Sequence, residues 1–380
     1  MTARWLLFML LVLPLCLWGC GQSEITTTTT STTSTTTVKS WQIVGSAGFT
    51  GTTEVEEAII ATDSAGTPYI AFSDGLPDQK PAVMKFSGGS WSDLGSRGFG
   101  LTTGSDYTSG SLSLTVSNNV PFVAFKTTAQ LLAAKFSSEA WTSLGSPSWT
   151  QAASFPSIFA NTSGQYIGYQ LTATTQANIK TFIDPSWGVV GTPNFSDGDA
   201  RYMSLYVNGT TPYLAFSDFA HSQRISVIKY NGIDWSYLGS TGGVSTDSVA
   251  WPSLFVDSGT AYVALLNSAE TVSVMKFNGT NWTLVGSAAA SAGQAGFPSL
   301  YIYNGTPYVA FADAAASNEA TVMKYTGSWE VVGAAGFSAD AMTRGIERTV
   351  SLTISPAGVP YIAVRGQHSG LNRLTVYKYN

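Results

Sequence analysis

Residues 298–333 read PSLYIYNGTPYVAFADAAASNEATVMKYTGSWEVVG, and looser copies of this stretch run through most of the chain. The copy begins with a short apolar segment, SLYI (299–302), followed by Asn304-Gly305. An Asn-Gly pair supplies the positive φ angles of a tight hairpin turn. The next segment, PYVAF (307–311), is apolar at consecutive positions. This pattern is typical of a strand that is covered on both faces.

Two further segments complete the unit. The third, ATVMKY (320–325), carries a lysine near its end, and the fourth is led by Trp329 and closes with Val332-Gly333. The same order recurs along the chain, with the leading tryptophan at Trp91, Trp141, Trp187, Trp235, Trp282 and Trp329. Successive tryptophans lie 46 to 50 residues apart. Four short strands repeated at this period are typical of a β-propeller blade.

The two ends of the repeat region complement one another. The last copy stops at Asn380, after its third strand, and a tryptophan segment, WQIVG (41–45), precedes the first copy. We expect this segment to serve as the fourth strand of the last copy, which removes the exposed edge of an open array. With Trp41 there are seven strand-leading tryptophans. The sequence therefore predicts an all-β fold, a seven-bladed β-propeller over 40–380 whose N-terminal strand completes the last blade.

As an architecture, the repeat resembles the kelch-like, WD40-like and Asp-box propellers, although the motifs of all three are absent. The stretch NGTNW (278–282) is similar to part of a sialidase Asp box, with Phe277 at the position of its aspartate. Residues 40–380 also resemble the repetitive propellers of bacterial surface lipoproteins. That resemblance implies a place at the cell surface and a shape, and it implies little about chemistry.

The first 20 residues are typical of an export signal. Arg4 precedes an apolar segment (5–17) that is too short to span a membrane as a helix. The segment ends in Leu17-Trp18-Gly19-Cys20, which resembles the bacterial lipoprotein cleavage box. The resemblance implies a lipid on Cys20 and anchoring to the bacterial cell envelope or surface; ordinary secretion is the alternative. Residues 21–39 are rich in Thr and Ser and predict a disordered tether.

Charge and cysteine content exclude several classes of function. The formal net charge is −5 and no basic patch is present, so nucleic acid is not an expected partner. The two cysteines, Cys16 and Cys20, both lie in the leader, so the repeat region has no disulfide and no cysteine metal site. No spacing of metal ligands repeats either. We expect no cofactor, no metal, and a monomer that meets the membrane only through its lipid.

The two faces of the predicted propeller differ in loop length. Connections from first to second strand, and from third to fourth, are short turns on one face. Connections from second to third strand, and between blades, are long and variable on the other. Variable loops on a rigid scaffold usually carry binding. The long-loop face is therefore the predicted functional face, with an extracellular glycan or protein as ligand.

Polar residues on the long-loop face form one set of candidate ligand contacts. Three aspartates end second strands, and both histidines and one arginine belong to the same loops: Asp74, Asp218, Asp313, His221, His368 and Arg365. One interpretation is a polar ring around the channel mouth that orients a ligand. The other, which we favour, is that each aspartate accepts bonds from backbone N–H groups in its own turn.

Aromatic residues form a second set. The repeated tryptophans hold one position in every copy, which favours packing between neighbouring sheets over sugar binding. Five aromatic residues instead lie in or beside the long loops: Trp149, Trp251, Tyr107, Phe195 and Phe219. We expect ligand contacts among these five, with Trp149 and Phe219 as the main candidates.

Two main functions stay open at this point, and a structural spacer in a larger envelope assembly is a third alternative. The main prediction is a cell-surface binding module. The alternative is an extracellular glycoside hydrolase or lyase that uses two carboxylates at the channel mouth, since such enzymes need a carboxylate pair at a defined separation. No Ser-His-Asp order or nucleophile elbow is present in the sequence, so we predict no catalytic residue.

Overall fold

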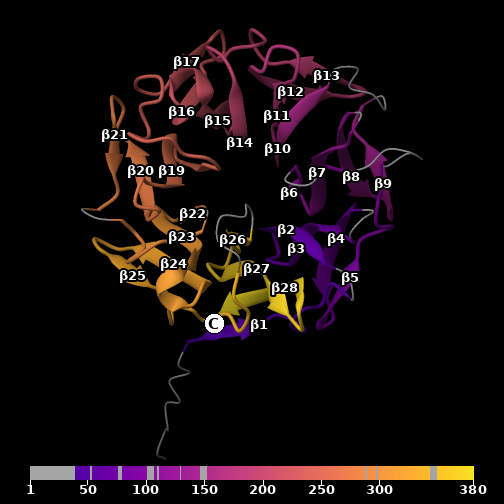
Figure 1. Cartoon of the computed structure of the whole chain (residues 1–380). Helices are drawn as coiled ribbons and strands as arrows, with labels where there is room; N and C mark the ends of the chain where they lie inside the picture. The colour runs from indigo at the N-terminus through magenta and orange to yellow at the C-terminus, as the bar shows by residue number, and fades with distance from the viewer. Residues whose placement is uncertain are drawn as a thin grey trace, which may run out of the picture. The chain divides into compact units, whose positions relative to one another are not determined.

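The computed structural model describes residues 39–51, 54–75, 79–100, 107–108, 111–128, 130–145, 152–286, 289–296, 298–342 and 349–380. These residues form seven antiparallel sheets of four strands each. The sheets follow one another in a ring around a central axis as the blades of a β-propeller (Figure 1). The predicted all-β, seven-bladed fold is confirmed. Among the described residues no helix is long and apolar enough to cross a membrane.

Consecutive strands make up the first six blades. Blades 1 to 3 consist of β2 (Val55–Thr62), β3 (Pro68–Asp74), β4 (Lys80–Ser87) and β5 (Ser90–Asp93); β6 (Ser113–Ser117), β7 (Val120–Lys126), β8 (Leu131–Ser137) and β9 (Ala140–Ser143); and β10 (Ala153–Asn161), β11 (Gly164–Leu171), β12 (Ala177–Ile183) and β13 (Ser186–Val189). Blades 4 to 6 consist of β14 (Ala200–Asn208), β15 (Thr211–Asp218), β16 (Arg224–Tyr230) and β17 (Trp235–Tyr237); β18 (Ser253–Asp257), β19 (Thr260–Leu266), β20 (Val272–Phe277) and β21 (Trp282–Leu284); and β22 (Ser299–Tyr303), β23 (Thr306–Asp313), β24 (Glu319–Tyr325) and β25 (Trp329–Val331).

Blade 7 joins the two ends of the repeat region. It contains β26 (Val350–Ile354), β27 (Pro360–His368), β28 (Leu371–Tyr379) and, as its outer strand, β1 (Trp41–Ile43). In the pairing of β1 with β28, Trp41 lies opposite Tyr379 and Ile43 opposite Tyr377. Figure 1 shows β1 beside β28 at the lower edge of the propeller. The predicted closure by the N-terminal strand is confirmed.

The apolar core lies between neighbouring blades. The second strands are buried along almost their whole length, as in β3, where every residue from Pro68 to Ser73 is buried. Ile70 and Phe72 of β3 belong to one cluster with Ala363 of β27 and Val376 of β28. Consecutive apolar residues therefore suit these strands because a neighbouring sheet covers each face.

The repeated tryptophans connect each blade to the one before it. Each indole N–H donates to a backbone carbonyl of the preceding blade at 2.6–3.2 Å, from Trp41, Trp91, Trp141, Trp187, Trp235, Trp282 and Trp329. The accepting residue directly precedes the glycine that ends each unit. At Gly333, where φ is +78°, an added Cβ would lie 2.9 Å from Tyr379 and 3.0 Å from Trp41. The prediction that these tryptophans pack between sheets is confirmed, and their contact explains the Val-Gly and Leu-Gly pairs.

Candidate ligand site at the channel mouth

A ring of serines surrounds the channel. Six blades place a serine at the same position of their first strand, and each Oγ accepts a bond from a backbone N–H of the next blade at 2.9–3.1 Å: Ser113, Ser157, Ser204, Ser253, Ser299 and Ser351. In blade 1 the position is held by Ile59. Accepting the bond does not use the hydroxyl proton, because a serine Oγ has two acceptor positions and one donor. The hydroxyls can therefore donate into the channel.

Three aromatic residues form an arc above the serine ring, toward the long-loop face. Phe155, Tyr202 and Trp251 each lie two residues before a ring serine. Their φ angles are +53°, +54° and +56°, which is the left-handed region that bulky side chains rarely adopt. In β10 and β14 the register shifts at this place, so a β-bulge turns the side chain toward the channel mouth. Strained backbone of this kind is concentrated at functional sites.

The members of this aromatic arc touch one another. The ring centroids of Phe155 and Tyr202 are 5.0 Å apart, and those of Tyr202 and Trp251 are 4.5 Å apart. All three side chains are half-buried. Tyr202, Trp251 and the ring serines line a cavity of about 210 Å³ to which all seven blades contribute.

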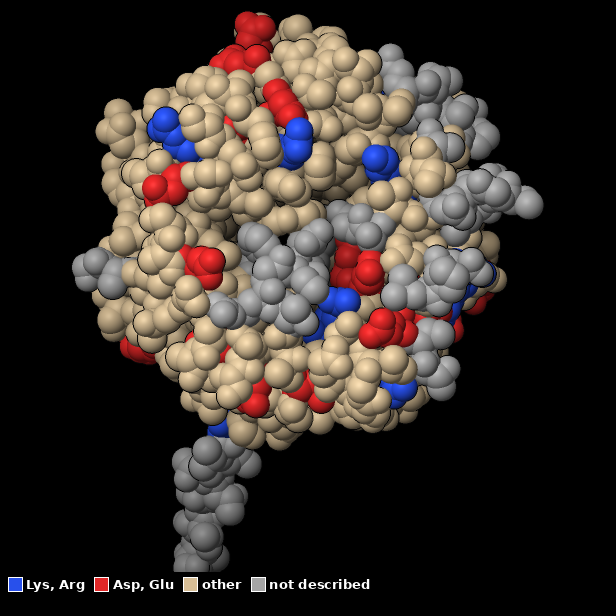
Figure 2. Space-filling model, in the orientation of Figure 1, with Lys and Arg blue, Asp and Glu red and all other residues tan. Residues whose placement is uncertain are grey.

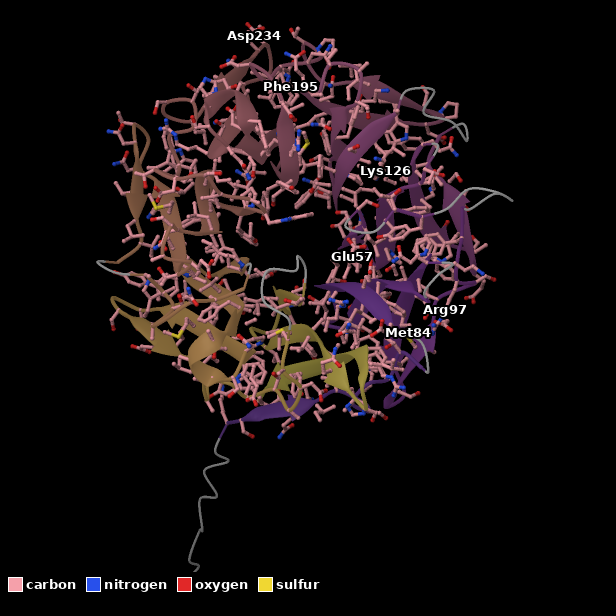
Figure 3. The ribbon with its side chains drawn as sticks, in the orientation of Figure 1. Glu57, Met84, Arg97, Lys126, Phe195 and Asp234 are labelled. Atoms are coloured by element: carbon pink, nitrogen blue, oxygen red, sulfur yellow. The ribbon has the colours of Figure 1, made fainter. Side chains whose placement is uncertain are left out.

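Blade 1 has a carboxylate where the arc has aromatic rings. Glu57 lies two residues before Ile59, has a φ of +61° and is only 3% exposed. Its Oε1 accepts from the backbone N–H of Leu112 at 3.1 Å, and its Oε2 accepts from the hydroxyl of Tyr107. Figure 3 places Glu57 beside the central opening. Blade 1 thus carries a buried carboxylate at the position where blades 3 to 5 carry aromatic rings.

Blades 3 to 6 carry aromatic residues at the other end of the channel. Phe159, Tyr206, Phe255 and Tyr301 each lie two residues after a ring serine, with successive centroids 4.7–4.8 Å apart. They line a cavity of about 330 Å³ with residues of the other blades. Burial, aided by Tyr301 and Asp257, raises the pKa of Tyr206 to about 12.

Two of the candidate aspartates each link their loop to the next connection between blades, and the favoured interpretation, a bond from a backbone N–H in the same turn, holds for Asp313 but not for Asp218. Asp218 Oδ2 accepts from the hydroxyl of Ser226 at 2.7 Å, and Ser226 in turn accepts from the N–H of Gly242 at 2.7 Å. Asp313 repeats the arrangement in blade 6, with Thr321 at 2.9 Å and an N–H of Gly336 at 3.0 Å from Thr321. Both aspartates are buried.

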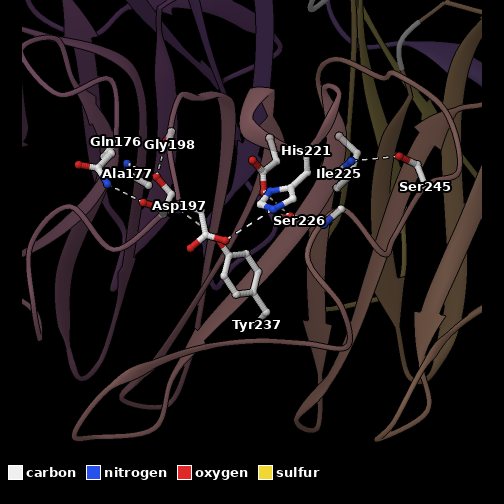
Figure 4. A network of polar contacts seen from close by, with 12 residues as sticks. Gln176, Ala177, Asp197, Gly198, His221, Ile225, Ser226, Tyr237 and Ser245 are labelled. Carbon is white, nitrogen blue, oxygen red and sulfur yellow. Dashed lines mark hydrogen bonds and ion pairs between the residues drawn. The ribbon is translucent and has the colours of Figure 1, made fainter.

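His221 lies near two carboxylates, of which Figure 4 labels Asp197. It ends η1 (Phe219–His221), and its Nδ1 is 2.9 Å from Asp218 Oδ2 while its Nε2 is 3.7 Å from Asp197 Oδ2. Tyr237 accepts from the N–H of Asp197 at 3.2 Å, and burial raises the pKa of this tyrosine. In blade 7, His368 forms a comparable contact with Asp340, at 3.4 Å.

The remaining polar candidates lie apart from this network. Asp74 pairs with Arg97 at 2.5 Å in blade 1, and Arg365 donates to the carbonyl of Val55 at 2.7 Å. The candidates thus come from four different blades, and the structure brings Asp218 and His221 into contact. Cys20 lies outside the described residues. Contact of the polar candidates with a ligand stays a prediction.

The aromatic candidates also lie in different places. Trp251 belongs to the arc, whereas Phe195 stacks on Trp235 with centroids 4.1 Å apart. Phe219 lies under the guanidinium of Arg201, 4.2 Å from the ring centroid. Trp149 lies outside the described residues. Phe155, Tyr202 and Glu57 were not predicted from the sequence. Phe155 and Tyr202 could have been found by their position, since each lies two residues before a first-strand serine.

Charged side chains are sparse and scattered on the face shown in Figure 2, where both signs occur among a majority of uncharged residues. In the described part of the chain no three histidine, cysteine or acidic residues are placed to hold a metal ion. The described side chains that line the channel mouth offer aromatic rings and hydroxyl groups.

The fold and the site define a seven-bladed β-propeller with an aromatic arc at its channel mouth. No protein-family model and no curated protein matches the sequence. Among solved structures, the chain is similar to a protein of unknown function from Dyadobacter fermentans, with 10% identity, a TM-score of 0.50, and 90% of this chain and 98% of that one covered.

Two further likenesses are weaker in TM-score. The fucose-specific lectin of Aleuria aurantia matches at 11% identity and a TM-score of 0.47, with 73% of this chain and 96% of that one covered. The Trypanosoma rangeli sialidase matches at 11% identity and a TM-score of 0.46, with 86% of this chain and 55% of that one covered. At these identities the likenesses concern the fold alone.

Proposed function

We propose that the protein is a binding module that takes a sugar residue of an extracellular glycan at the long-loop end of its channel. The observation that carries this proposal is the aromatic arc, in which Phe155, Tyr202 and Trp251 hold left-handed backbone conformations around the channel mouth. Such strain costs about 1–3 kcal/mol per residue, and strained residues cluster at ligand sites.

The chemistry of the mouth matches the chemistry of a sugar. A pyranose ring has an apolar C–H face, which packs against an aromatic ring, and hydroxyl groups at its edge. Tyr202 and Trp251 supply the aromatic surface, and the serine ring below supplies O–H donors. Ligand sites commonly combine an apolar wall with a few placed polar groups in this way.

The size of the site favours one sugar residue over an extended chain. The cavity measures about 210 Å³, whereas pockets for drug-sized ligands measure about 300–1,000 Å³. No Asp or Glu is found among the described residues that line it. The geometry therefore supports binding better than hydrolysis by paired carboxylates, which needs both groups beside the sugar.

A glycan array followed by titration tests the proposal. We expect binding to glycans of one class, and at least a tenfold loss of affinity in Trp251→Ala, which corresponds to about 1.4 kcal/mol. Phe219→Ala is the matched control, because Phe219 packs under Arg201. Absence of binding on the array, or full affinity in Trp251→Ala, would contradict the proposal.

We further propose that Cys20 carries a lipid and that residues 21–39 present the propeller on a bacterial cell surface. The support is the apolar leader ending in Leu17-Trp18-Gly19-Cys20 and the Thr- and Ser-rich stretch behind it. Expressed in a bacterium, the protein should sediment with membranes, and Cys20→Ser should not. Equal membrane association of both forms would argue against a lipid on Cys20.

A further inference from the structure

Four interfaces between blades contain a phenylalanine stacked on the strand-leading tryptophan. The ring centroids are 4.1–4.7 Å apart and the ring planes differ by 9–24°, in the pairs Phe49–Trp91, Phe99–Trp141, Phe195–Trp235 and Phe337–Trp41. In each case the phenylalanine follows the unit's closing glycine by four residues. Each interface thus holds a flat ring parallel to an indole.

Ala290 holds this position at the interface between blades 5 and 6. Its N–H donates to the carbonyl of Val272 at 2.7 Å, as the N–H of Phe337 donates to Ala320 at 3.0 Å. The next residue, Ser291, accepts from the N–H of Val272 at 2.9 Å, as Ser338 accepts from Ala320 at 2.9 Å. The backbone hydrogen bonds are therefore the same at the two interfaces. The interface between blades 5 and 6 has the methyl group of Ala290 where the interface between blades 6 and 7 has the ring of Phe337.

A cavity of about 490 Å³ results beside the indole of Trp329. Its walls include Ala290, Phe311, Met323 and Tyr325. The volume falls within the range of about 300–1,000 Å³ that is usual for small-molecule pockets. The interface between blades 4 and 5 differs. There Val244 precedes the serine that corresponds to Ser291, and its side chain is buried in the core of the interface.

The buried polar side chains of this cavity are bonded within the protein. Ser291 donates to the carbonyl of Gly293 at 2.8 Å, and Thr321 donates to Asp313 at 2.9 Å. Asp313 also accepts from the N–H of Ala315 at 3.0 Å. These groups are already satisfied, so the cavity is suited to an apolar ring and poorly suited to the hydroxyls of a sugar.

We propose that this cavity is a second binding site, distinct from the channel mouth, for a small planar aromatic molecule of one or two rings. The ligand stacks face to face on Trp329, in the place that a phenylalanine occupies on Trp41, Trp91, Trp141 and Trp235. Three observations support this ligand class: the stacking geometry at the four interfaces that contain a phenylalanine, the volume of the cavity, and its satisfied polar groups.

Thermal melting of the protein with indole as the probe tests the proposal. A ligand that binds only the folded state raises the melting temperature as its concentration increases. We expect indole to do so with the natural protein and to have no such effect on Ala290→Phe, whose new ring fills the cavity. Methyl α-glucoside is the control ligand, because the cavity is poorly suited to a sugar. Its effect on the melting temperature should be the same in the natural protein and in Ala290→Phe.

Two further variants keep the test decisive. Ala290→Leu blocks the cavity if Ala290→Phe does not fold, and Phe337→Ala opens the equivalent space on Trp41 and should gain an additional indole site by calorimetric titration. No rise with the natural protein, or an equal rise in the blocked variants, would overturn the proposal. The peptide acetyl-Ala-Gly-Phe-Ser-amide, which has the sequence of residues 335–338 around Phe337, is a second probe. If this peptide binds and indole does not, the proposal is overturned in favour of a polypeptide ligand.

Discussion

Asp218 illustrates how a single buried side chain organises a loop on the long-loop face. It is fully buried, it accepts from Ser226, and through Ser226 it holds the N–H of Gly242. We predict that Asp218→Ala lowers the free energy of unfolding by about 1–3 kcal/mol, because the hydroxyl of Ser226 loses its acceptor in a buried place. Chemical denaturation measures this loss.

Asp197 is the matched control for Asp218. Its side chain is 53% exposed, although it also lies near His221. Asp197→Ala should change the free energy of unfolding by less than about 0.5 kcal/mol, as is usual for exposed positions. Unchanged stability in Asp218→Ala would contradict the role of this buried carboxylate in holding the loop.

Tyr206 and Tyr169 should make the protein sensitive to alkali. Burial raises the pKa of each tyrosine to about 12, from an ordinary value of about 10. The folded state therefore keeps their protons at pH values where the unfolded state releases them. Stability should be independent of these groups below about pH 10 and should fall between about pH 10 and 12.

Melting curves across this pH range check the prediction. Tyr206→Phe should lose less stability than the natural protein between about pH 10 and 12, because one of the titrating groups is gone. Identical pH dependence in the two proteins would show that Tyr206 does not titrate in this way.

Strand β1 is expected to contribute far more stability than its three residues suggest. It pairs with β28, and Trp41 both bonds to Val332 and stacks on Phe337. We predict that a chain beginning at Thr50 loses about 3–5 kcal/mol or more, because it lacks Trp41 together with the buried Val44 and with Phe49, which stacks on Trp91. A chain beginning at Lys39 is the control and should melt like the full protein. Equal melting of the two shortened chains would contradict closure by β1.

The blades could be predicted from the sequence because their signals are local and repeated. The Asn-Gly turns, the apolar second strands and the spacing of the tryptophans each follow from short-range chemistry. The unpaired Trp41 segment then indicated closure. The role of the Val-Gly and Leu-Gly pairs was less accessible, since the glycine is required by an indole from the next blade.

The channel mouth was harder to predict for a physical reason. Tyr202 and Phe155 hold left-handed conformations that sequence rules reserve for Gly and Asn, so no propensity argument places them at a bulge. Glu57 gives no sign in the sequence that it occupies the same position in blade 1. Trp251 was recognised because it breaks the repeat, although its neighbours in the arc come from other blades.

Across the propeller as a unit, repeated residues build the scaffold, and residues at which the blades differ shape the two proposed sites. Blades 3 to 5 place aromatic rings where blade 1 places Glu57. Blade 5 places Ala290 where other blades place phenylalanine. Because both differences lie on a rigid, closed scaffold, a substitution in one site should leave the other unaffected.

The affinity of Tyr202→Ala for the glycan selected on the array tests the central claim most directly. Calorimetric titration should show a dissociation constant at least tenfold larger than that of the natural protein. The dissociation constant of Phe219→Ala should stay within about twofold, which is less than about 0.5 kcal/mol. Melting curves for both variants establish that they are folded. Full affinity in Tyr202→Ala together with a loss in Phe219→Ala would place the ligand on the outer loops and contradict binding at the channel mouth.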